Sequence, residues 1–278
     1  MLAHDIIKTF DRDEVVVSDL KAVADRPTFI ADITKYAEVR ELVNKVRPGL
    51  LINASAFTDV DGCEEDVDLA YSVNAKGPEN IAMVCKEYRI KMVHISTDYI
   101  FDGAASVPYK ESDLPSPVGM YGKSKLAGEI FIAKNLKQRY ILRTALLYGI
   151  NRENFVSKIY AKLKNNEPIT VPDDMMGSPT WTVELAKMIK GIYRTHKFGT
   201  YHAVNTGNCS RYEWALKIAE LSGLKGDITP VKSASLQTKV KRPSFSALDN
   251  SKLRAIVPGI LSWEEALKGF IKELQEKK

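Results

Sequence analysis

Short runs of apolar residues alternate along the first half of the chain with longer segments in which apolar residues recur every three or four positions. The runs at 14–18, 28–30, 50–52, 91–95 and 139–143 predict buried strands, and the segments 36–46, 68–88 and 121–136 predict helices. Strands that alternate with helices are typical of a parallel sheet covered on both faces. The pattern therefore predicts an α/β fold with a doubly wound, Rossmann-like parallel sheet.

The strict alternation stops after Tyr148. Helices are expected at 154–166, 183–195, 211–222 and 263–277, an edge strand at 168–172, and a strand at 200–204 that rejoins the main sheet. The proline-containing stretch between the last two helices is expected to be irregular. We expect a dinucleotide-binding domain made of 1–149 plus about 177–206. A smaller C-terminal substrate-binding lobe would contain about 150–176 plus 207–278.

The start of the chain departs from this plan. A dinucleotide-binding unit opens with a strand, a glycine-rich turn and then a helix. This chain begins with Met-Leu-Ala-His, which is already helix-like, and it contains no G-x-G-x-x-G. We expect that a first strand and glycine-rich turn of roughly ten residues are missing before Met1. The alternative is a truly short chain that binds cofactor poorly or not at all.

Composition excludes several classes of function. The net charge of +5 comes without a long basic run, which argues against nucleic-acid binding and also suits an anionic small-molecule substrate. No apolar run is long enough to span a membrane, and no signal peptide is visible. The 3 cysteines are widely spaced, which is typical of a cytoplasmic protein, and the 4 histidines lack metal-ligand spacing. We therefore expect no membrane partner and no metal.

Polar residues follow the predicted strands. Ligands of doubly wound sheets bind at the carboxyl ends of the strands. Those ends here carry Asp19, Asp32, Asn53-Ala54-Ser55-Ala56, Ser96-Thr97 and Thr144. The next predicted helix begins with Tyr121-Gly-Lys-Ser-Lys125, which places a tyrosine and a lysine one turn apart on the same face. That spacing alone fits a catalytic pair, but equally a packed aromatic beside a lysine that extends to water.

The combination is more specific than either part. Ser96-Thr97 at a strand end, followed by Y-x-x-x-K in the next helix, resembles the extended short-chain dehydrogenase/reductase superfamily. The blocks "RPGLLINASAFTDVDGCEED", "VHISTDYIFDG", "YGKSKLAGE" and "GSPTWTVELA" resemble the dTDP-4-dehydrorhamnose reductase family. Similar blocks run in family order from about residue 47 to 247. The resemblance implies NAD(P)H-dependent reduction of dTDP-4-dehydro-L-rhamnose to dTDP-L-rhamnose.

Two other functions share this pattern. One is a non-catalytic, cofactor-binding regulatory subunit like the methionine adenosyltransferase β subunit. The other is a reductase or epimerase of another nucleotide sugar. Retention of Thr97, Tyr121 and Lys125 argues against a purely regulatory role, because a regulator does not need them.

The catalytic residues expected are Thr97, Tyr121 and Lys125. A free tyrosine has a pKa of about 10, which is too high for acid–base catalysis near neutrality. A nearby ammonium stabilises the tyrosinate and lowers that pKa, and Lys125 stands one turn away. A hydroxyl at the strand end can hold the ketone in line. Ser96 or Thr97 could do this, and the resemblance favours Thr97; it also implies that Lys125 bonds the nicotinamide ribose.

The cofactor, NADH or NADPH, is expected to lie along the strand ends. An acid at the end of the second strand, Asp19, would bond the adenosine ribose and disfavour a 2′-phosphate, which favours NADH over NADPH. The positive charge of nearby Lys21 weakens the argument for NADH. The alternative role for Asp19 is a helix or turn cap. By resemblance Asp32 and Ile33 flank the adenine, although Asp32 equally suits a helix cap. The remaining expected cofactor contacts are Asn53, Ala54, Ser55, Ala56, Thr58, Ser96, Tyr121 and Lys125.

Substrate contacts are expected from both parts of the chain, namely Val60, Asp61, Phe101, Asp102 and Arg242. The guanidinium of Arg242 could form a forked bond to a diphosphate, or only a surface salt bridge. The family often has a tryptophan two or three residues after its Arg-Thr, whereas this chain reads Arg143-Thr-Ala-Leu-Leu-Tyr148. That difference leaves the exact nucleotide sugar open. The chain is expected to act as a monomer or homodimer.

Overall fold

Four parallel strands form the main sheet. The structure is a computed structural model that describes residues 1–10, 15–23, 26–235, 240 and 242–276. The sheet has the order β10 (Gly199–His202), β5 (Arg139–Thr144), β4 (Lys91–Thr97) and β3 (Leu50–Asn53), so β10 joins it as predicted. A separate parallel pair is made by β1 (Val17–Asp19) and β2 (Thr28–Ile30). Glu14, the first residue expected in β1, lies outside the described residues.

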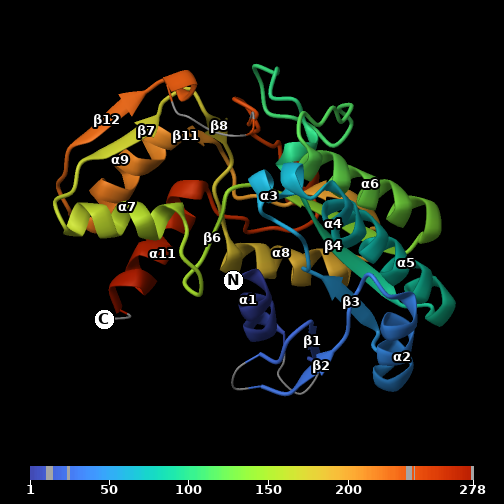
Figure 1. Ribbon diagram of the computed structural model, residues 1–278. Coiled ribbons are helices and arrows are strands. Elements are labelled where there is room, and N and C mark those ends of the chain that lie inside the picture. The colour runs from blue at the N-terminus through green and yellow to red at the C-terminus, as the bar shows by residue number, and fades with distance from the viewer. Residues whose placement is uncertain (11–14, 24–25, 236–239, 241, 277–278) are drawn as a thin grey trace.

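Helices cover both faces of this sheet (Figure 1). On one face lie α1 (Leu2–Thr9) and α8 (Thr182–Thr195), and on the other α2 (Tyr36–Val46), α5 (Gly77–Tyr88) and α6 (Met120–Asn135). Successive strand residues point to opposite faces, so Val93 packs with α8 while Met92 packs with α5. Because both faces are buried, the strands are apolar throughout, which is why they read as short continuous runs.

A second core builds the smaller lobe, seen at the left of Figure 1. The helices α7 (Phe155–Lys164), α9 (Arg211–Ser222) and α11 (Trp263–Glu276) pack there against the parallel pair β7 (Ile169–Pro172) and β12 (Ile228–Val231). Trp214 and Phe270 fill its centre. The described chain also contains the short strands β6 (Leu147–Tyr148), β8 (Met176–Gly177), β9 (Thr180–Trp181) and β11 (Cys209–Ser210), and the short helices η4 (Ser233–Ser235) and α10 (Ser251–Arg254).

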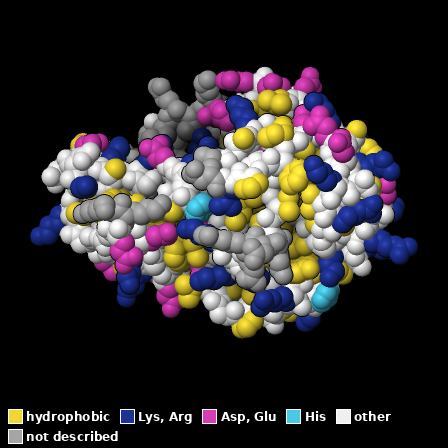
Figure 2. All heavy atoms as spheres, turned by 90° about the horizontal axis from the view of Figure 1, so that it is seen from below, with side chains coloured by type: hydrophobic (Ala, Val, Ile, Leu, Met, Phe, Trp, Pro, Cys, Tyr) yellow, Lys and Arg dark blue, Asp and Glu magenta, His cyan; other side chains and the backbone are white. Residues whose placement is uncertain are grey.

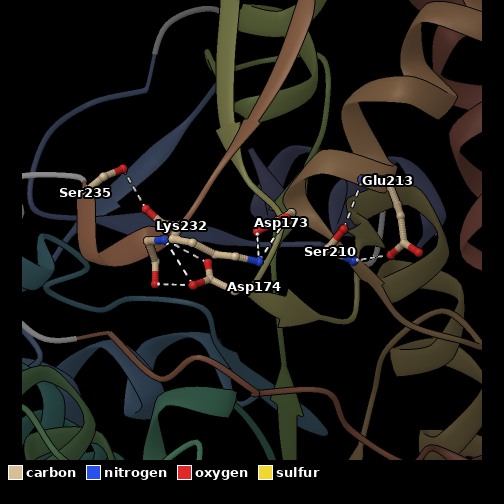
Figure 3. A network of polar contacts seen from close by, with 7 residues as sticks. Asp173, Asp174, Ser210, Glu213, Lys232 and Ser235 are labelled. Atoms are coloured by element: carbon tan, nitrogen blue, oxygen red, sulfur yellow. Dashed lines mark hydrogen bonds and ion pairs between the residues drawn. The ribbon is translucent and has the colours of Figure 1, made fainter.

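Polar contacts tie the ends of the lobe's elements together (Figure 3). Ser210 caps α9 by accepting from the Glu213 amide at 3.0 Å, while the Glu213 carboxylate accepts from the Ser210 amide at 2.7 Å. This reciprocal pair satisfies two backbone N–H groups that the helix would leave free. Lys232 after β12 donates to Asp173 after β7 at 2.9 Å. The first contact fixes the start of α9, and the second joins the ends of β7 and β12.

Two local predictions were wrong. The continuous helix expected at 68–88 is interrupted: α4 (Val67–Tyr71) passes through a π-helical turn, η2 (Ser72–Lys76), into α5. This turn lets the buried Asn74 side chain bond the Phe57 amide and carbonyl, at 2.9 and 3.0 Å. Residues 60–65, to which no element was assigned from the sequence, form a helix, α3 (Val60–Glu65). The stretch expected to be irregular contains β12, η4 and α10.

The surface carries both signs of charge. Basic and acidic side chains are interspersed on the face shown in Figure 2. No helix in the described part of the chain combines the length and apolar character that crossing a bilayer requires. Within the same residues, no group of three or more His, Cys, Asp or Glu side chains is placed to hold a metal ion. All 3 cysteines are buried and unpaired.

Candidate active site

The site forms where β4 and β5 end and α6 begins. Thr97, the last residue of β4, pairs in register with Thr144 of β5. A 3-10 turn, η3 (Asp98–Ile100), follows β4 at once. Tyr121 lies in the first turn of α6, close enough for its phenol and the Thr97 hydroxyl to influence each other. The strand-end hydroxyl and the tyrosine, 24 residues apart in sequence, are therefore neighbours.

A glycine permits this close approach. Gly122 packs directly against η3, where an added Cβ would overlap the carbonyl oxygen of Tyr99. Any larger residue there would push the start of α6 away from Thr97. The tyrosine rings of positions 99 and 121 meet edge to face, with centroids 5.7 Å apart. Backbone contact at Gly122 thus sets the position of the Tyr121 phenol.

Burial makes Tyr121 a weak acid in the free protein. It raises the pKa of the phenol well above its ordinary value, and the Thr97 hydroxyl opposes that rise only when its proton is not donated to Asp98. Negative charge at Asp98 raises this pKa further. The expected lowering of this pKa by Lys125 was wrong for the free protein, because Lys125 Nζ bonds the Ile95 carbonyl and is not among the groups that act on the phenol. The phenol stays protonated at neutral pH, so it can donate a proton.

Lys125 is buried one turn further along α6, with its ammonium directed at the edge of β4. Its Nζ donates to the Ile95 carbonyl at 2.6 Å and lies 3.4 Å from His94 Nε2. Burial lowers the pKa of Lys125 to about 8, against the raising effect of the Glu129 carboxylate. The charge of Lys125 therefore changes close to neutrality.

Asp98 controls the hydroxyl of Thr97. Thr97 Oγ1 donates to Asp98 Oδ1 at 3.0 Å and accepts from the Tyr99 amide at 3.2 Å. Burial raises the pKa of Asp98 from 3.8 to about 6, and the Ser246 and Thr97 hydroxyl groups oppose that rise. The single proton of Thr97 is engaged while Asp98 is ionised. When Asp98 is protonated, that proton is free to point elsewhere.

Ser96 has a different partner. Its hydroxyl donates to Glu129 Oε1 at 2.5 Å, and the same carboxylate receives a forked pair of bonds from Arg143, with Nη2 to Oε2 at 2.8 Å. All three side chains are buried. Because the Ser96 hydroxyl already donates its proton to Glu129, Ser96 is the weaker candidate for holding a ketone. The predicted contact of Ser96 with the cofactor stays a prediction. Thr97 is the hydroxyl beside Tyr121.

The predicted cofactor residues lie at the ends of β1, β2 and β3. Asp19 is exposed at the end of β1, and Asp32 follows β2, where bonds from the Thr34 hydroxyl and amide lower the pKa of its carboxyl. Asn80 of α5 donates to the Ile33 carbonyl at 3.0 Å, which holds that loop. Asn53 is buried at the end of β3. The side chains that follow it are partly or fully exposed: Ala54, Ser55, Ala56 and Thr58.

The predicted substrate residues fall into two groups. Val60 and Asp61 lie in the first turn of α3, and Asp61 Oδ2 is 3.8 Å from Arg242 Nη2. That pair brings α3 and the C-terminal part of the chain together. By contrast, Phe101 is fully buried and stacks on Tyr109, with centroids 4.2 Å apart.

Asp102, which follows Phe101, has a structural partner. Its carboxylate accepts from the Tyr109 hydroxyl at 2.8 Å and from the Ala104 amide at 3.0 Å, and these bonds lower its pKa. Phe101 and Asp102 therefore stabilise the loop after η3. Their contact with substrate stays a prediction.

Arg211 was not foreseen from the sequence. It is the first residue of α9, its guanidinium lies 5.0 Å from the Phe155 ring centroid, and its charge acts on Tyr99, Asp98 and Arg242. A cation in the first turn opposes the helix dipole. A positive charge at the start of a predicted helix was therefore the sequence feature that could have identified Arg211, because an unfavourably placed charge that is half-buried usually has a partner or ligand. His94 and Glu129 were also missed.

Known proteins are similar to this chain over most of its length. The model of the RmlD substrate binding domain family matches residues 1–276. The spore coat polysaccharide biosynthesis protein SpsK of Bacillus subtilis (strain 168) is 36% identical over 242 residues, covering 87% of this chain and 85% of that protein. The dTDP-4-dehydrorhamnose reductase of Streptomyces griseus is 35% identical over 244 residues, covering 85% and 80%.

A solved structure agrees with them. The dTDP-4-dehydrorhamnose reductase of Bacillus anthracis str. Ames, in complex with NADP, superimposes with a TM-score of 0.90 at 35% identity, covering 98% of this chain and 95% of that chain. The predicted Rossmann-like fold and the predicted family are thereby confirmed. The chain belongs to the RmlD substrate binding domain family, the dTDP-4-dehydrorhamnose reductase family that its motifs resemble.

Proposed function

We propose that the protein is an NAD(P)H-dependent dTDP-4-dehydrorhamnose reductase, which reduces the 4-keto group of dTDP-4-dehydro-L-rhamnose to give dTDP-L-rhamnose. The observation that carries this proposal is that Thr97, at the carboxyl end of β4, lies beside Tyr121, with Lys125 buried one turn further along α6, in a chain of this family. Hydroxyl, phenol and ammonium are the groups that protonation of a developing alkoxide requires.

A bound NADH or NADPH supplies the hydride, and the residues of this chain handle the proton. Tyr121 donates its phenolic proton to the carbonyl oxygen as that oxygen becomes an alkoxide. The Lys125 ammonium then stabilises the tyrosinate by its charge. Thr97 orients the ketone, and protonation of Asp98 leaves the Thr97 hydroxyl free to do so, since the two share one hydrogen bond at 3.0 Å.

The residues present suit a dinucleotide. Small exposed side chains at Ala54 and Ser55 let the backbone approach a ligand closely at the end of β3. Asp19 presents an exposed carboxylate at the end of β1, where a ribose hydroxyl can donate to it. Lys125 uses one N–H for the Ile95 carbonyl, so the others remain for a ribose hydroxyl. We assign dinucleotide binding to 1–149 with about 177–206.

The sugar nucleotide is assigned to the face between the two lobes. The guanidinium groups of Arg211 and Arg242 both act on Tyr99, and two such groups can bind a diphosphate by forked hydrogen bonds. Substrate contacts at Val60, Asp61, Phe101 and Asp102 belong to the same proposal, as does a substrate-binding lobe of about 150–176 plus 207–278. The buried free cysteines suit a cytoplasmic enzyme, which would be a monomer or homodimer.

Removal of the Tyr121 hydroxyl tests this function. We expect Tyr121→Phe to bind reduced cofactor as the wild type does and to lose about 10²- to 10⁴-fold in kcat, the usual contribution of a general acid. The assay follows loss of reduced-nicotinamide absorbance with the keto sugar nucleotide, and cofactor fluorescence reports binding. Tyr88→Phe is the control, because Tyr88 ends α5 just before β4 begins, at the opposite edge of the sheet.

Each failure has a distinct meaning. Turnover by Tyr121→Phe at the wild-type rate would refute the proton donor. Cofactor binding by the wild type without turnover of this sugar would refute the reductase function and support the regulatory-subunit alternative. Turnover of a different 4-keto nucleotide sugar in preference to this one would refute the substrate and retain the reaction class.

A further inference from the structure

A chain of hydrogen bonds runs from the end of β3 to the catalytic lysine. The Ser55 amide donates to Asn53 Oδ1 at 3.1 Å, which fixes the orientation of the Asn53 amide group. Its Nδ2 then faces His94 Nδ1 at 3.1 Å. Since an amide nitrogen can only donate, Nδ1 of His94 must accept.

This arrangement determines the tautomer of His94. Burial, together with the nearby Lys125 ammonium, holds the pKa of the imidazole well below its ordinary value, so the ring is neutral. A neutral ring that accepts at Nδ1 carries its proton on Nε2. That Nε2–H points at Lys125 Nζ, 3.4 Å away.

Lys125 therefore faces one donor and one acceptor. Its Nζ gives a proton to the Ile95 carbonyl at 2.6 Å, whereas the His94 N–H offers it a proton. A neutral amine satisfies both contacts, because it has a lone pair for the imidazole N–H. An ammonium satisfies only the carbonyl and meets the positive end of the imidazole dipole.

We propose that His94 is a positioning residue for the reduction, one that holds Lys125 Nζ at the Ile95 carbonyl and biases Lys125 towards the neutral amine. This role for His94 in the reaction rests on the proposed function, but its effect on Lys125 does not. His94 lies in the middle of β4 and reaches the reacting atoms only through Lys125.

Other titratable groups lie near Lys125 and Tyr121 on α6, α3 and η3. Glu129, one turn further along α6, favours the ammonium, but its carboxylate is already paired with Arg143 of β5. From α3 and η3, Cys63, Asp98 and Tyr99 act on Tyr121. The side chain that η2 presents to α6, Asn74, is uncharged and bonds Ser124 at 3.1 Å. Among these groups, His94 is the basic side chain in contact with Lys125.

The consequence is an upper pH limit for the reaction. Burial already lowers the pKa of Lys125 to about 8. Below that pH the ammonium can stabilise the Tyr121 phenolate, and above it this help is lost. The His94 N–H favours loss of the ammonium's proton, so its removal should extend activity to higher pH.

Lysine nitrogen and carbon NMR tests the proposal directly. The full chain is prepared with lysines labelled at Cε and Nζ, and the Lys125 signal is assigned by its absence from Lys125→Met. We expect the wild-type signal to titrate with a midpoint near 8 and that of His94→Leu about one pH unit higher. Leucine keeps the site apolar, so the change isolates the N–H.

Two further variants make the result decisive. His202→Leu removes another buried histidine, on β10, and should leave the Lys125 midpoint unchanged. Asn53→Ala keeps His94 but frees its tautomer, so the midpoint should again rise, and this variant substitutes if His94→Leu does not fold. An unchanged midpoint in a folded His94→Leu, or in Asn53→Ala, would overturn the proposal.

The pH dependence of kcat provides a second test. The alkaline limb of the kcat profile should move upward in His94→Leu, alongside the NMR midpoint. A loss of kcat that is equal at all pH values, with no movement of the limb, would show a merely structural role. The NMR titration needs no sugar substrate, so it stands or fails separately from the proposed reductase activity.

Discussion

Replacing Glu129 with glutamine breaks a buried ion pair that ties α6 to the centre of the main sheet. The Glu129 and Arg143 side chains are only 5% and 7% exposed. Arg143 donates from Nε to Oε1 at 3.1 Å and from Nη2 to Oε2 at 2.8 Å, a forked geometry. Ser96 of β4 donates to the same carboxylate. The carboxylate thus joins three elements at once.

The expected loss follows from this burial. A glutamine keeps one oxygen acceptor but turns an NH₂ group towards the guanidinium, which leaves the Arg143 charge buried and uncompensated. Breaking one partner of a buried pair costs about 3–5 kcal/mol. That is a large part of the roughly 5–15 kcal/mol by which proteins of ordinary stability are folded. We therefore expect Glu129→Gln to unfold at a much lower denaturant concentration.

Urea unfolding followed by circular dichroism measures the loss. Glu220→Gln is the matched control, because Glu220 forms a short 2.6 Å pair with Lys217 but is 64% exposed. Water screens such a pair, and its loss should cost less than about 1 kcal/mol. The Arg143→Met variant and the double variant complete a double-mutant cycle, in which the double variant should lose less than the two single losses combined.

Two results would refute the reasoning. One is a Glu129→Gln loss no larger than that of Glu220→Gln, which would mean that the pair is not desolvated in solution. The other is strict additivity in the cycle, which would mean that Glu129 and Arg143 do not stabilise each other.

Three further predictions follow from the site. Burial raises the pKa of Asp98 from 3.8 to about 6, so the contribution of Asp98 to stability should fall by about 3 kcal/mol as pH rises from about 4 to about 7; urea unfolding at the two pH values should show the stability of the wild type relative to Asp98→Asn falling by that amount. Gly122→Ala should cost about 1–3 kcal/mol and lower kcat, because its Cβ meets the Tyr99 carbonyl, whereas Gly49→Ala, with open space, should do neither. Asp19→Asn should raise the NADPH-to-NADH ratio of kcat/KM about fivefold, the effect of about 1 kcal/mol between charges in water; an unchanged ratio would remove Asp19 from the cofactor site.

Local patterns were the most predictable part of the fold. The helices at Tyr36–Val46 and Arg211–Ser222 have the bounds expected from their spacing of apolar residues. The parallel sheet followed from short apolar runs, because strands buried on both faces need no polar alternation. The interruption at η2 was not predictable, since it depends on Asn74 reaching the Phe57 backbone, 17 residues earlier.

The catalytic motif was also readable from the sequence. Tyr121 and Lys125 are one helical turn apart, and a polar strand end such as Thr97 marks the ligand-binding edge of a doubly wound sheet. The family resemblance then favoured a catalytic pair over a packed aromatic beside a lysine, and the matching family model confirmed the family. These patterns are local in the sequence, so they can be recognised without the structure.

The surroundings of the motif were decided only by the tertiary structure. His94 meets Asn53 across 41 positions and Lys125 across 31, and both contacts depend on the register of β3 against β4 and on how closely α6 packs. Arg211 comes from the other lobe. No local pattern records such contacts, because the residues involved lie on different elements. The sequence determined which groups react, and the folded structure determined their burial, their hydrogen-bond partners and hence their acidity.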